Sequence, residues 1–426
     1  MQHIFKKTLL VSALSLAIAP AAYATNGLAP TGLGQVHKAM GGAAVGNPQN
    51  TMSMATNPAA ASFVSDGYDV GLELFKPNRT VTNSAWTDAV SPGLAGTKYT
   101  GDGDSIFFIP EVGYKRTVGD LSLGVVAYGN GGMNTSYDKG SPVFITPGPG
   151  TAPFNGGAPS TTGVNLEQLF IAPTISKKIN QNHSIGLSVN LVAQRFKATG
   201  LQAFQGDPRV VNTEAFMDPG NSSSTGIGAT IGWMGKVNDK VTLGASYRLK
   251  TKMSDFKKYR GLFPSGSMDI PAALSIGGSV KVSPRTTLAM DIQQIYYSDT
   301  KATGNPVDSQ QPFGSDKGAG FGWDDQTVYK IGVKHQKSPK LALMAGYNHG
   351  KSPIGSEETR FNALTPGVVE DHLSLGFEYK LSQNSSLVGS YTHAFNNKVK
   401  GDGTKGQPFD LEMDQDAVGI GYSRTF

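Results

Sequence analysis

Three basic residues, Arg248, Lys330 and Lys334, are the main candidates for ligand chemistry in this sequence. Each lies in a segment where apolar and polar residues alternate, on the polar side of the alternation. A carboxylate that leaves water needs a cationic partner, so these side chains could hold the head group of an acidic ligand. They could instead pair with Asp291 and Glu378, which have the same parity. The sequence leaves both possibilities open.

Motifs for enzymatic chemistry are missing from the sequence. It has no GxSxG nucleophile turn, no HExxH zinc motif and no GxxxxGK phosphate loop. Its 7 His are dispersed and it has no Cys, so we expect no metal site. The net charge of +5 is small and scattered, which argues against a nucleic-acid partner. We therefore predict that the protein is not an enzyme and uses no cofactor.

The elements that carry the three cations are predicted to be β-strands. From Gly67 onward, short runs alternate apolar residues with small or polar ones, which is the period of a strand with two different faces. The clearest run has Leu373, Leu375 and Phe377 on one side and Ser374 on the other. The apolar side is continuous, whereas the polar side is rich in Gly. A transmembrane β-barrel has this pattern because one face meets lipid and the other meets a lumen.

Short and long connections alternate strictly between these runs. The short ones hold the residues of tight turns, as in Asn238-Asp239-Lys240, and the long ones are rich in Gly, Pro and Ser. Outer-membrane barrels have short periplasmic turns and long outer loops in this way. We therefore predict an all-β fold, a 14-stranded antiparallel transmembrane β-barrel over residues 67–426, in the outer membrane of a Gram-negative bacterium. The expected strands are 67–80, 105–117, 121–130, 165–178, 184–199, 224–236, 241–252, 269–282, 286–299, 325–336, 341–349, 370–381, 386–399 and 415–426.

Two N-terminal segments do not share the strand pattern. Residues 1–24 are predicted to be a secretory signal peptide, because Lys6 and Lys7 precede an apolar stretch and Ala22-Tyr23-Ala24 has the form of a cleavage site. Residues 25–66 are rich in Ala, Gly, Met and Asn and are nearly uncharged. We expect residues 25–66 to form a hatch, a plug packed inside the barrel, because the segment is too apolar to hang free. The alternative is a flexible tail.

Several short motifs, in their order along the chain, resemble FadL-type outer-membrane transporters. Three of them are similar to the hatch of that family: Gly32-Leu33-Gly34, Ala39-Met40-Gly41-Gly42-Ala43 and Asn57-Pro58-Ala59. Others match its barrel: NDKVTLGASYR at 238–248, DIPAALSIGGSVKVSP at 269–284, MAGYNHGKSPI at 344–354 and GYSRTF at 421–426. The similarity spans nearly the whole mature chain. The family includes long-chain fatty acid transporters and toluene and xylene uptake proteins.

The resemblance implies passive uptake of hydrophobic compounds, with long-chain fatty acids as the first expectation. In this family a ligand is captured between the outer loops, moves to a lumenal pocket and leaves sideways through a kink in the third strand after the hatch rearranges. Asn57, Pro58 and Ala59 are then the expected hatch residues. Gly129 and Gly131 would permit the kink, although they could equally begin the next loop. The barrel, expected to be a monomer, would be surrounded by outer-membrane lipid and lipopolysaccharide.

The outer loops are expected to supply apolar contacts to the ligand. Exposed aromatic residues on a charged surface suggest such a contact patch, and packing between the loops is the alternative. The candidates are Phe204, Phe216, Phe256, Leu262 and Phe263.

Two other functions stay open at this stage. Aromatic hydrocarbons could replace fatty acids in the same kind of channel, because pocket shape decides between them. An adhesin or phage-receptor barrel is the alternative from another class. A general porin is disfavoured because residues 25–66 would have no role in an open pore.

Deletion of residues 25–66 is predicted to raise the small-ion conductance of the purified barrel in a planar bilayer, because the hatch would no longer fill the lumen. An unchanged conductance would show that this segment does not plug the barrel.

Overall fold

A closed barrel of antiparallel strands forms the body of the protein. The computed structural model describes residues 26–84, 96–138, 161–201, 207–216, 219–403 and 409–426. The sheet closes because β15 pairs with both β14 and β1, and β2 (Lys98–Thr100) is a short strand beside the end of β1. The other strands are the fourteen that the sequence predicts: β1 (Gly67–Asn83), β3 (Phe107–Val118), β4 (Leu121–Tyr137), β5 (Thr162–Lys178), β6 (His183–Thr199), β7 (Ser222–Lys236), β8 (Val241–Arg248), β9 (Ala273–Ser283), β10 (Thr286–Ile295), β11 (Gln326–Gln336), β12 (Leu341–Gly350), β13 (Asp371–Lys380), β14 (Ser385–Val399) and β15 (Phe409–Thr425).

The alternation of side chains along each strand produces an apolar outer wall. On β13, Leu373, Leu375 and Phe377 are 42%, 50% and 40% exposed, whereas Ser374 between them is 0% exposed. Exposed large hydrophobic residues recur at this spacing around the barrel, as expected for a face that meets lipid. Among the described residues, no helix has the length and apolar character needed to cross a membrane.

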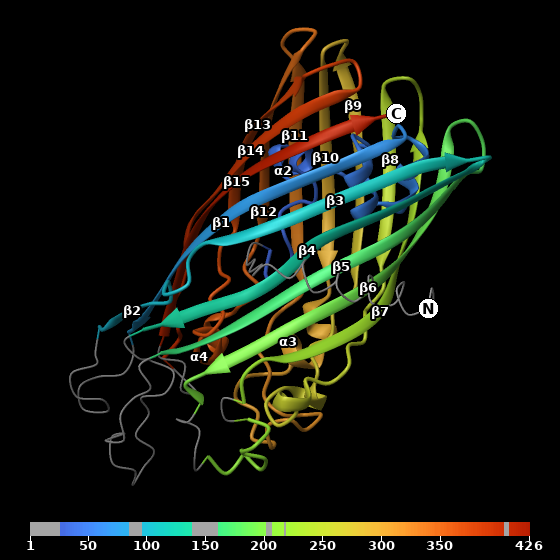
Figure 1. The fold of residues 1–426 in the computed structure, drawn as a ribbon. Coiled ribbons are helices and arrows are strands. Elements are labelled where there is room, and N and C mark those ends of the chain that lie inside the picture. Colours follow the sequence, from blue (N-terminus) through green and yellow to red (C-terminus); the bar gives the residue numbers. More distant parts are fainter. Residues whose placement is uncertain (1–25, 85–95, 139–160, 202–206, 217–218, 404–408) are drawn as a thin grey trace, which may run out of the picture.

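The barrel has two different ends, which we call the turn end and the loop end (Figure 1). Tight connections such as Gly119-Asp120 join the strands at the turn end, at the top of the view. Long connections and the loop helices gather at the other end: η5 (Lys257–Tyr259), η6 (Pro264–Gly266), η7 (Tyr297–Asp299), α3 (Lys301–Gly304), η8 (Ser356–Glu358) and α4 (Thr359–Asn362).

The strand ends at the loop end differ from the sequence prediction. β4 continues to Tyr137 rather than residue 130, and β15 begins at Phe409 rather than 415. Both extensions are held in ladders with long neighbours, β5 and β1, which the local pattern does not reveal. β8, β9 and β10 are shorter than predicted, because the chain beyond them makes isolated bridges such as Thr251↔Ile270 instead of continuing the ladder.

Residues 26–66, the hatch, lie inside the ring of strands (Figure 1, blue). Helix α2 (Gln35–Ala39) contacts β12 to β15, whereas η1 (Thr51–Ala55) contacts β1, β3 and β4. The third element, η2 (Pro58–Ser62), contacts β4 to β7. Since these strands lie on different sides of the barrel, the hatch crosses the lumen.

A buried ion-pair cluster fixes helix α2 to the wall. Lys38 Nζ lies 2.9 Å from Glu73 Oε2 on β1 and 3.8 Å from Glu111 Oε2 on β3. Glu111 also accepts hydrogen bonds from Gly34 N and Gln35 Nε2, both at 3.1 Å. Removing one partner of a buried ion pair costs about 3–5 kcal/mol, so this contact resists separation of the hatch from the wall.

Inward-facing glycines let the hatch backbone approach the wall closely. A Cβ at Gly346 would lie 2.1 Å from Gly41 N, and one at Gly244 would lie 2.1 Å from the Val45 carbonyl oxygen. Real Cβ atoms do not come this near to backbone, so these positions need a residue without a side chain. Much of the Gly content on the polar side of the strands serves this packing.

Gly346→Ala is predicted to destabilise the docked hatch by about 1–3 kcal/mol, the usual cost of overpacking a filled interior. The expected result is a lower thermal unfolding midpoint together with a raised small-ion conductance. Ala345→Val is the matched control, because Ala345 is the preceding residue of β12 and belongs to the outward-facing set. Equal behaviour of the two variants would contradict the close contact.

Candidate functional site

A cavity of about 60 Å³ lies in the lumen between the hatch and the wall. The hatch contributes its N-terminal stretch to the lining, including Ala29, Pro30 and Leu33, and β8 and β11 contribute Arg248 and Lys330. Two of the three cations predicted from the sequence are thus brought together, and Lys334 is not. Small-molecule sites usually measure about 300 Å³ or more, so this cavity is too small to hold a typical ligand without widening.

Arg248, the last residue of β8, has no acidic partner among the residues that the structure describes. Its Nη1 donates to Asn130 Oδ1 at 3.3 Å and its Nη2 donates to the Pro271 carbonyl at 3.4 Å, while its buried Nε has no hydrogen-bond acceptor. Within the described residues, no carboxylate oxygen lies within 4.0 Å of this guanidinium. Arg248 is therefore able to take an anionic group.

Lys330 also lacks an ion pair within 4.0 Å among the residues that the structure covers. Its Nζ donates to the Thr31 carbonyl of the hatch at 3.1 Å. Asp291 lies opposite Lys330 in the β10–β11 ladder, but its Oδ2 accepts from the backbone N–H groups of Ala44 and Val45 at 2.6 and 3.0 Å. Asp291 thus interacts with Lys330 electrostatically without a direct ion pair, while its Oδ2 is bound to the hatch backbone.

Lys334 makes the structural ion pair that the sequence left open. Its Nζ lies 2.7 Å from Glu378 Oε2 and donates to Gln49 Oε1 at 2.8 Å. This cation joins the hatch to the wall and is already neutralised, which makes it a poor ligand partner.

A second, apolar pocket of about 60 Å³ lies among the loops at the loop end. Leu262 and Phe263, two of the predicted contact residues, line it. The other side chains of its lining are also apolar. These residues are Val164, Phe196, Ala198, Leu201, Pro264, Ala302, Phe313, Ala319, Gly320, Phe321, Phe361 and Leu364.

Two other predicted loop aromatics, Phe216 and Phe256, do not line this pocket. Phe216 and Phe256 are each 0% exposed, although the sequence analysis expected exposed side chains. Phe216 packs edge-on against Phe313 at 5.3 Å, and Phe256 lies 5.7 Å from Phe263, so both fill space between loops. Phe204 lies outside the described residues.

One apolar cluster joins the outer pocket to the lumenal cavity. Phe263 and Leu364 of the pocket belong to the same contiguous set of buried side chains as Leu28 and Ala29 of the hatch. Ala29 also lines the lumenal cavity. Apolar surface therefore continues from the loops to the cavity that Arg248 and Lys330 line.

The wall beside the cavity contains a break. The β3–β4 ladder runs from Val118↔Leu121 to Glu111↔Tyr128 and ends there, although β4 continues to Tyr137. Toward the loop end from this point, β3 pairs with β1 and β4 pairs with β5, and Ser136 of β4 bridges to Asp102. From Tyr128 to Thr135 every residue of β4 is buried, so this half of the strand has lost the alternation of a simple barrel wall.

Gly129 and Gly131 lie at a β-bulge beside this break. Gly129 pairs with Leu169 and Gly131 with Gln168, which leaves Asn130 as an extra residue in β4. The strand continues beyond them, so they do not begin the loop. A Cβ at Gly131 would lie 1.7 Å from the Leu28 carbonyl oxygen, which shows how closely the hatch contacts the bulge.

Arg79 of β1 forms hydrogen bonds across the break at its edge nearest the loop end. This side chain is 2% exposed. Its guanidinium donates from Nε to Asp102 at 3.1 Å, from Nη1 to Asn134 Oδ1 at 2.9 Å and from Nη2 to the Asp104 carbonyl at 2.6 Å. These bonds satisfy groups that the missing β3–β4 ladder would otherwise leave unpaired.

The predicted hatch residues Asn57, Pro58 and Ala59 anchor the hatch at the opposite side. Asn57 Nδ2 donates to the Val45 carbonyl at 2.8 Å and to the Trp233 carbonyl at 3.0 Å, and its Oδ1 accepts from Ala59 N at 3.1 Å. Pro58 begins η2. Asn57 thus fixes the hatch to β7, and the Ala59 carbonyl accepts from Ser176 of β5 and Ser184 of β6. None of the three residues lines the lumenal cavity.

The first residues of the hatch bond to one tyrosine. Tyr297 Oη donates to the Asn26 carbonyl at 2.6 Å and accepts from Leu28 N and Ala29 N at 2.8 and 3.2 Å. Burial raises the pKa of Tyr297, so the phenol stays neutral and keeps its proton as a donor. Tyr297 therefore ties the segment beside the cavity to the chain that follows β10.

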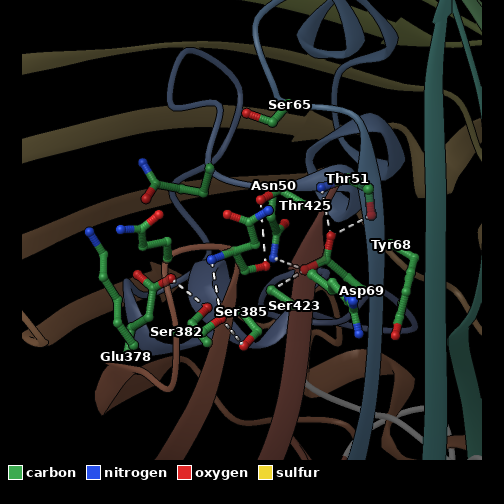
Figure 2. Close-up of a pocket in the computed structure, with 17 residues that line it drawn as sticks. Asn50, Thr51, Ser65, Tyr68, Asp69, Glu378, Ser382, Ser385, Ser423 and Thr425 are labelled. Atoms are coloured by element: carbon green, nitrogen blue, oxygen red, sulfur yellow. Dashed lines mark hydrogen bonds between the residues drawn. The ribbon is translucent and has the colours of Figure 1, made fainter.

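A polar pocket of about 180 Å³ lies at the turn end between hatch and wall (Figure 2). There Asp69 accepts from Asn50 Nδ2 at 2.9 Å and from Thr51 N at 2.8 Å, and Ser423 also donates to it. Figure 2 shows Glu378 and the serines of the nearby turn around the same space. An apolar ligand would deprive these polar groups of water, so this pocket is not the ligand site. Among the described residues there is also no group of acidic or His side chains suited to a metal.

The sequence analysis missed Asn130, Arg79 and Glu111. A signal existed for Asn130, because the run Gly129-Asn130-Gly131-Gly132 has a polar residue within glycines. No signal existed for Arg79 or Glu111, because their contacts depend on where the β3–β4 ladder ends.

Arg79→Ala is predicted to destabilise the barrel by about 3 kcal/mol, since it leaves buried carbonyl and carboxylate groups unpaired. Arg79→Lys should recover part of the loss, because it restores the charge without the planar fork. Thermal unfolding in detergent measures the effect, with Arg116→Ala at an exposed position of β3 as control. If Arg79→Ala lost no more thermal stability than the control, the proposed role of the Arg79 hydrogen bonds across the break would be wrong.

The sequence matches the family described as Outer membrane protein transport protein (OMPP1/FadL/TodX) over residues 10–426. It is also 25% identical over 204 residues to a protein of Neisseria meningitidis serogroup B that is named as an outer membrane protein. That match covers 40% of this chain and 42% of the relative, so it spans less than half of the relative's length.

The fold is similar to several solved structures. The toluene transporter TodX of Pseudomonas putida has a TM-score of 0.69 and 19% identity, over 93% of this chain and 99% of that one. A FadL homologue of Pseudomonas aeruginosa has a TM-score of 0.68 and 15% identity, over 94% and 99%. The toluene transporter TbuX of Ralstonia pickettii has a TM-score of 0.66 and 17% identity, over 93% and 99%.

The family match covers nearly the whole chain, and the closed barrel agrees with the solved structures. Proteins of this family are transport channels rather than enzymes. The chain thus belongs to the OMPP1/FadL/TodX family of outer membrane transport proteins.

Proposed function

We propose that the protein takes up hydrophobic compounds that carry a carboxylate, with long-chain fatty acids as the main substrates. The observation that carries this proposal is the position of Arg248 and Lys330 on one lumenal cavity, where neither cation forms an ion pair within 4.0 Å among the described residues. A carboxylate would neutralise them with charge-assisted hydrogen bonds, whereas a hydrocarbon would gain nothing from them.

The apolar cluster supports a route from the loops to this cavity. Transfer of an apolar chain from water to such surroundings gains about 25 cal/mol per Å² buried. A fatty acid would enter the pocket at Leu262 and Phe263, with its chain replacing contacts within the cluster and its carboxylate reaching Arg248. The hatch residues around Ala29, which bond to Tyr297, must move for this.

Exit through the wall is the second part of the proposal. The break between β3 and β4 lies beside the cavity, because Asn130 belongs to both. The rest of the hatch is tied to the wall by Lys38 and by the anchor at Asn57. A ligand that leaves through the break reaches the membrane without displacing these contacts.

Aromatic hydrocarbons are the alternative substrates. TodX and TbuX, whose folds are similar, are named as toluene transporters. A neutral ring would fit the loop pocket as well as an acyl chain does, but it would leave Arg248 and Lys330 without an anion.

Arg248→Gln and Lys330→Gln are each predicted to weaken oleate binding to the detergent-purified barrel about 10- to 100-fold, the effect of losing one charge-assisted hydrogen bond. Lys334→Gln is the matched control, because Lys334 is already paired with Glu378. Direct binding of radiolabelled oleate and toluene measures both substrate classes.

If the three substitutions leave toluene binding unchanged and oleate shows no saturable binding, the substrates are hydrocarbons rather than fatty acids. Failure of both ligands to bind would favour the adhesin or phage-receptor alternative.

A further inference from the structure

The extra residue of the β4 bulge is also the residue that contacts the cation of the lumenal cavity. Asn130 has no partner in the β4–β5 register, since Gly129 pairs with Leu169 and Gly131 with Gln168. Its side chain is 3% exposed and lines the same cavity as Arg248. A bulge re-aims one side chain, and here it directs an amide into the lumen.

The bonds that hold this amide are long. Arg248 Nη1 donates to Asn130 Oδ1 at 3.3 Å, and Asn130 Nδ2 donates to Gln168 Oε1, also at 3.3 Å. Well-formed bonds of this kind measure about 2.9–3.0 Å. A carboxylate oxygen binds a guanidinium at about 2.7–2.9 Å and roughly twice as strongly as a neutral acceptor does. A ligand carboxylate would therefore displace the amide of Asn130 from Arg248.

We propose that Asn130 couples ligand binding to the opening of the wall: a carboxylate on Arg248 releases Asn130, and the released bulge loosens β4 along the break. The inference rests on the proposed function, because it needs an acidic ligand at Arg248. Asn130 acts through the strand that contains it, so it is a positioning residue of the transport route.

The release reaches the wall because residues 129–134 of β4 are in a ladder on one side only. Toward the turn end from Tyr128 the strand pairs with β3 and β5, whereas from Gly129 to Asn134 the ladder that the structure describes is with β5, and Ser136 beyond it bridges to Asp102. The bulge also touches the Leu28 carbonyl through Gly131, so the first hatch residues and the strand move together. Arg79 holds Asn134 at the edge of the break nearest the loop end, which confines the loosening to residues 129–134.

Coupling of this kind is reciprocal, so changes at Asn130 must alter ligand binding. Asn130→Asp supplies a permanent carboxylate to Arg248. It should weaken oleate binding about 10- to 100-fold and leave toluene binding unchanged. Asn130→Ala removes the competitor. It should bind oleate at least as tightly as the native protein, but the exchange of the β4 amides should no longer respond to the ligand.

The test is hydrogen exchange of the full-length barrel in lipid nanodiscs, measured on peptides that cover residues 129–134, with oleate, with toluene and without ligand. In the native protein, oleate should speed exchange there roughly two- to tenfold, the factor that loss of one hydrogen bond produces, and toluene should not. Asn397→Asp is the matched control. Asn397 also lies beside a bulge, in β14, but its Nδ2 donates to the Val368 carbonyl at 2.8 Å.

The outcomes separate this inference from the function on which it rests. If native protein binds oleate but exchange at 129–134 is unchanged, or if toluene speeds it equally, the coupling is wrong and the proposed function stands. Normal oleate binding by Asn130→Asp would also overturn the coupling. If the native protein binds toluene and not oleate, the proposed function itself fails. Should Asn130→Asp not fold, the ligand response of Asn130→Ala decides the question.

Discussion

The need to pair every backbone polar group within a membrane governs this structure. Fourteen strands meet it by closing the sheet through β15 and β1. Only closure removes free edges, because lipid offers no hydrogen bonds. The β3–β4 ladder ends early, which breaks this rule locally. There the Arg79 guanidinium donates to the Asp104 carbonyl, and the hatch packs against the bulge. The break is thus a built feature with its own partners.

The hatch has two parts with different contacts. Its body is tied to the wall by the buried Lys38 cluster, by the Asn57 anchor and by backbone packed on inward glycines. Its first residues bond to Tyr297 and face the cavity that Arg248 and Lys330 line. In the proposed route, this second part moves and the first stays in place. A transporter of this design can admit a ligand without removing its plug.

The sequence was sufficient for the barrel and for part of the site. Period-two alternation and the contrast between short and long connections predicted all fourteen strands, and parity placed Arg248 and Lys330 on the lumenal face. Alternation fails where both faces of a strand are buried, so the part of β4 beyond residue 130 was predicted to be a loop. The partners of Lys330 and Lys334 could not be predicted, because the hatch backbone, which has no periodicity, decides which carboxylate each cation meets.

The central claim is that ligand leaves through the wall while the body of the hatch stays docked. A disulfide between Gln35→Cys and Gly421→Cys tests it most directly, because a Cβ at Gly421 would lie 3.4 Å from the Gln35 Cβ, near the ~3.8 Å typical of disulfides. The protein has no other Cys, so the bond is unique and joins α2 to β15. Oleate uptake by cells that carry the oxidised variant is predicted to match uptake after reduction. Uptake that stops on oxidation and returns with reductant would show that the hatch itself must leave its place.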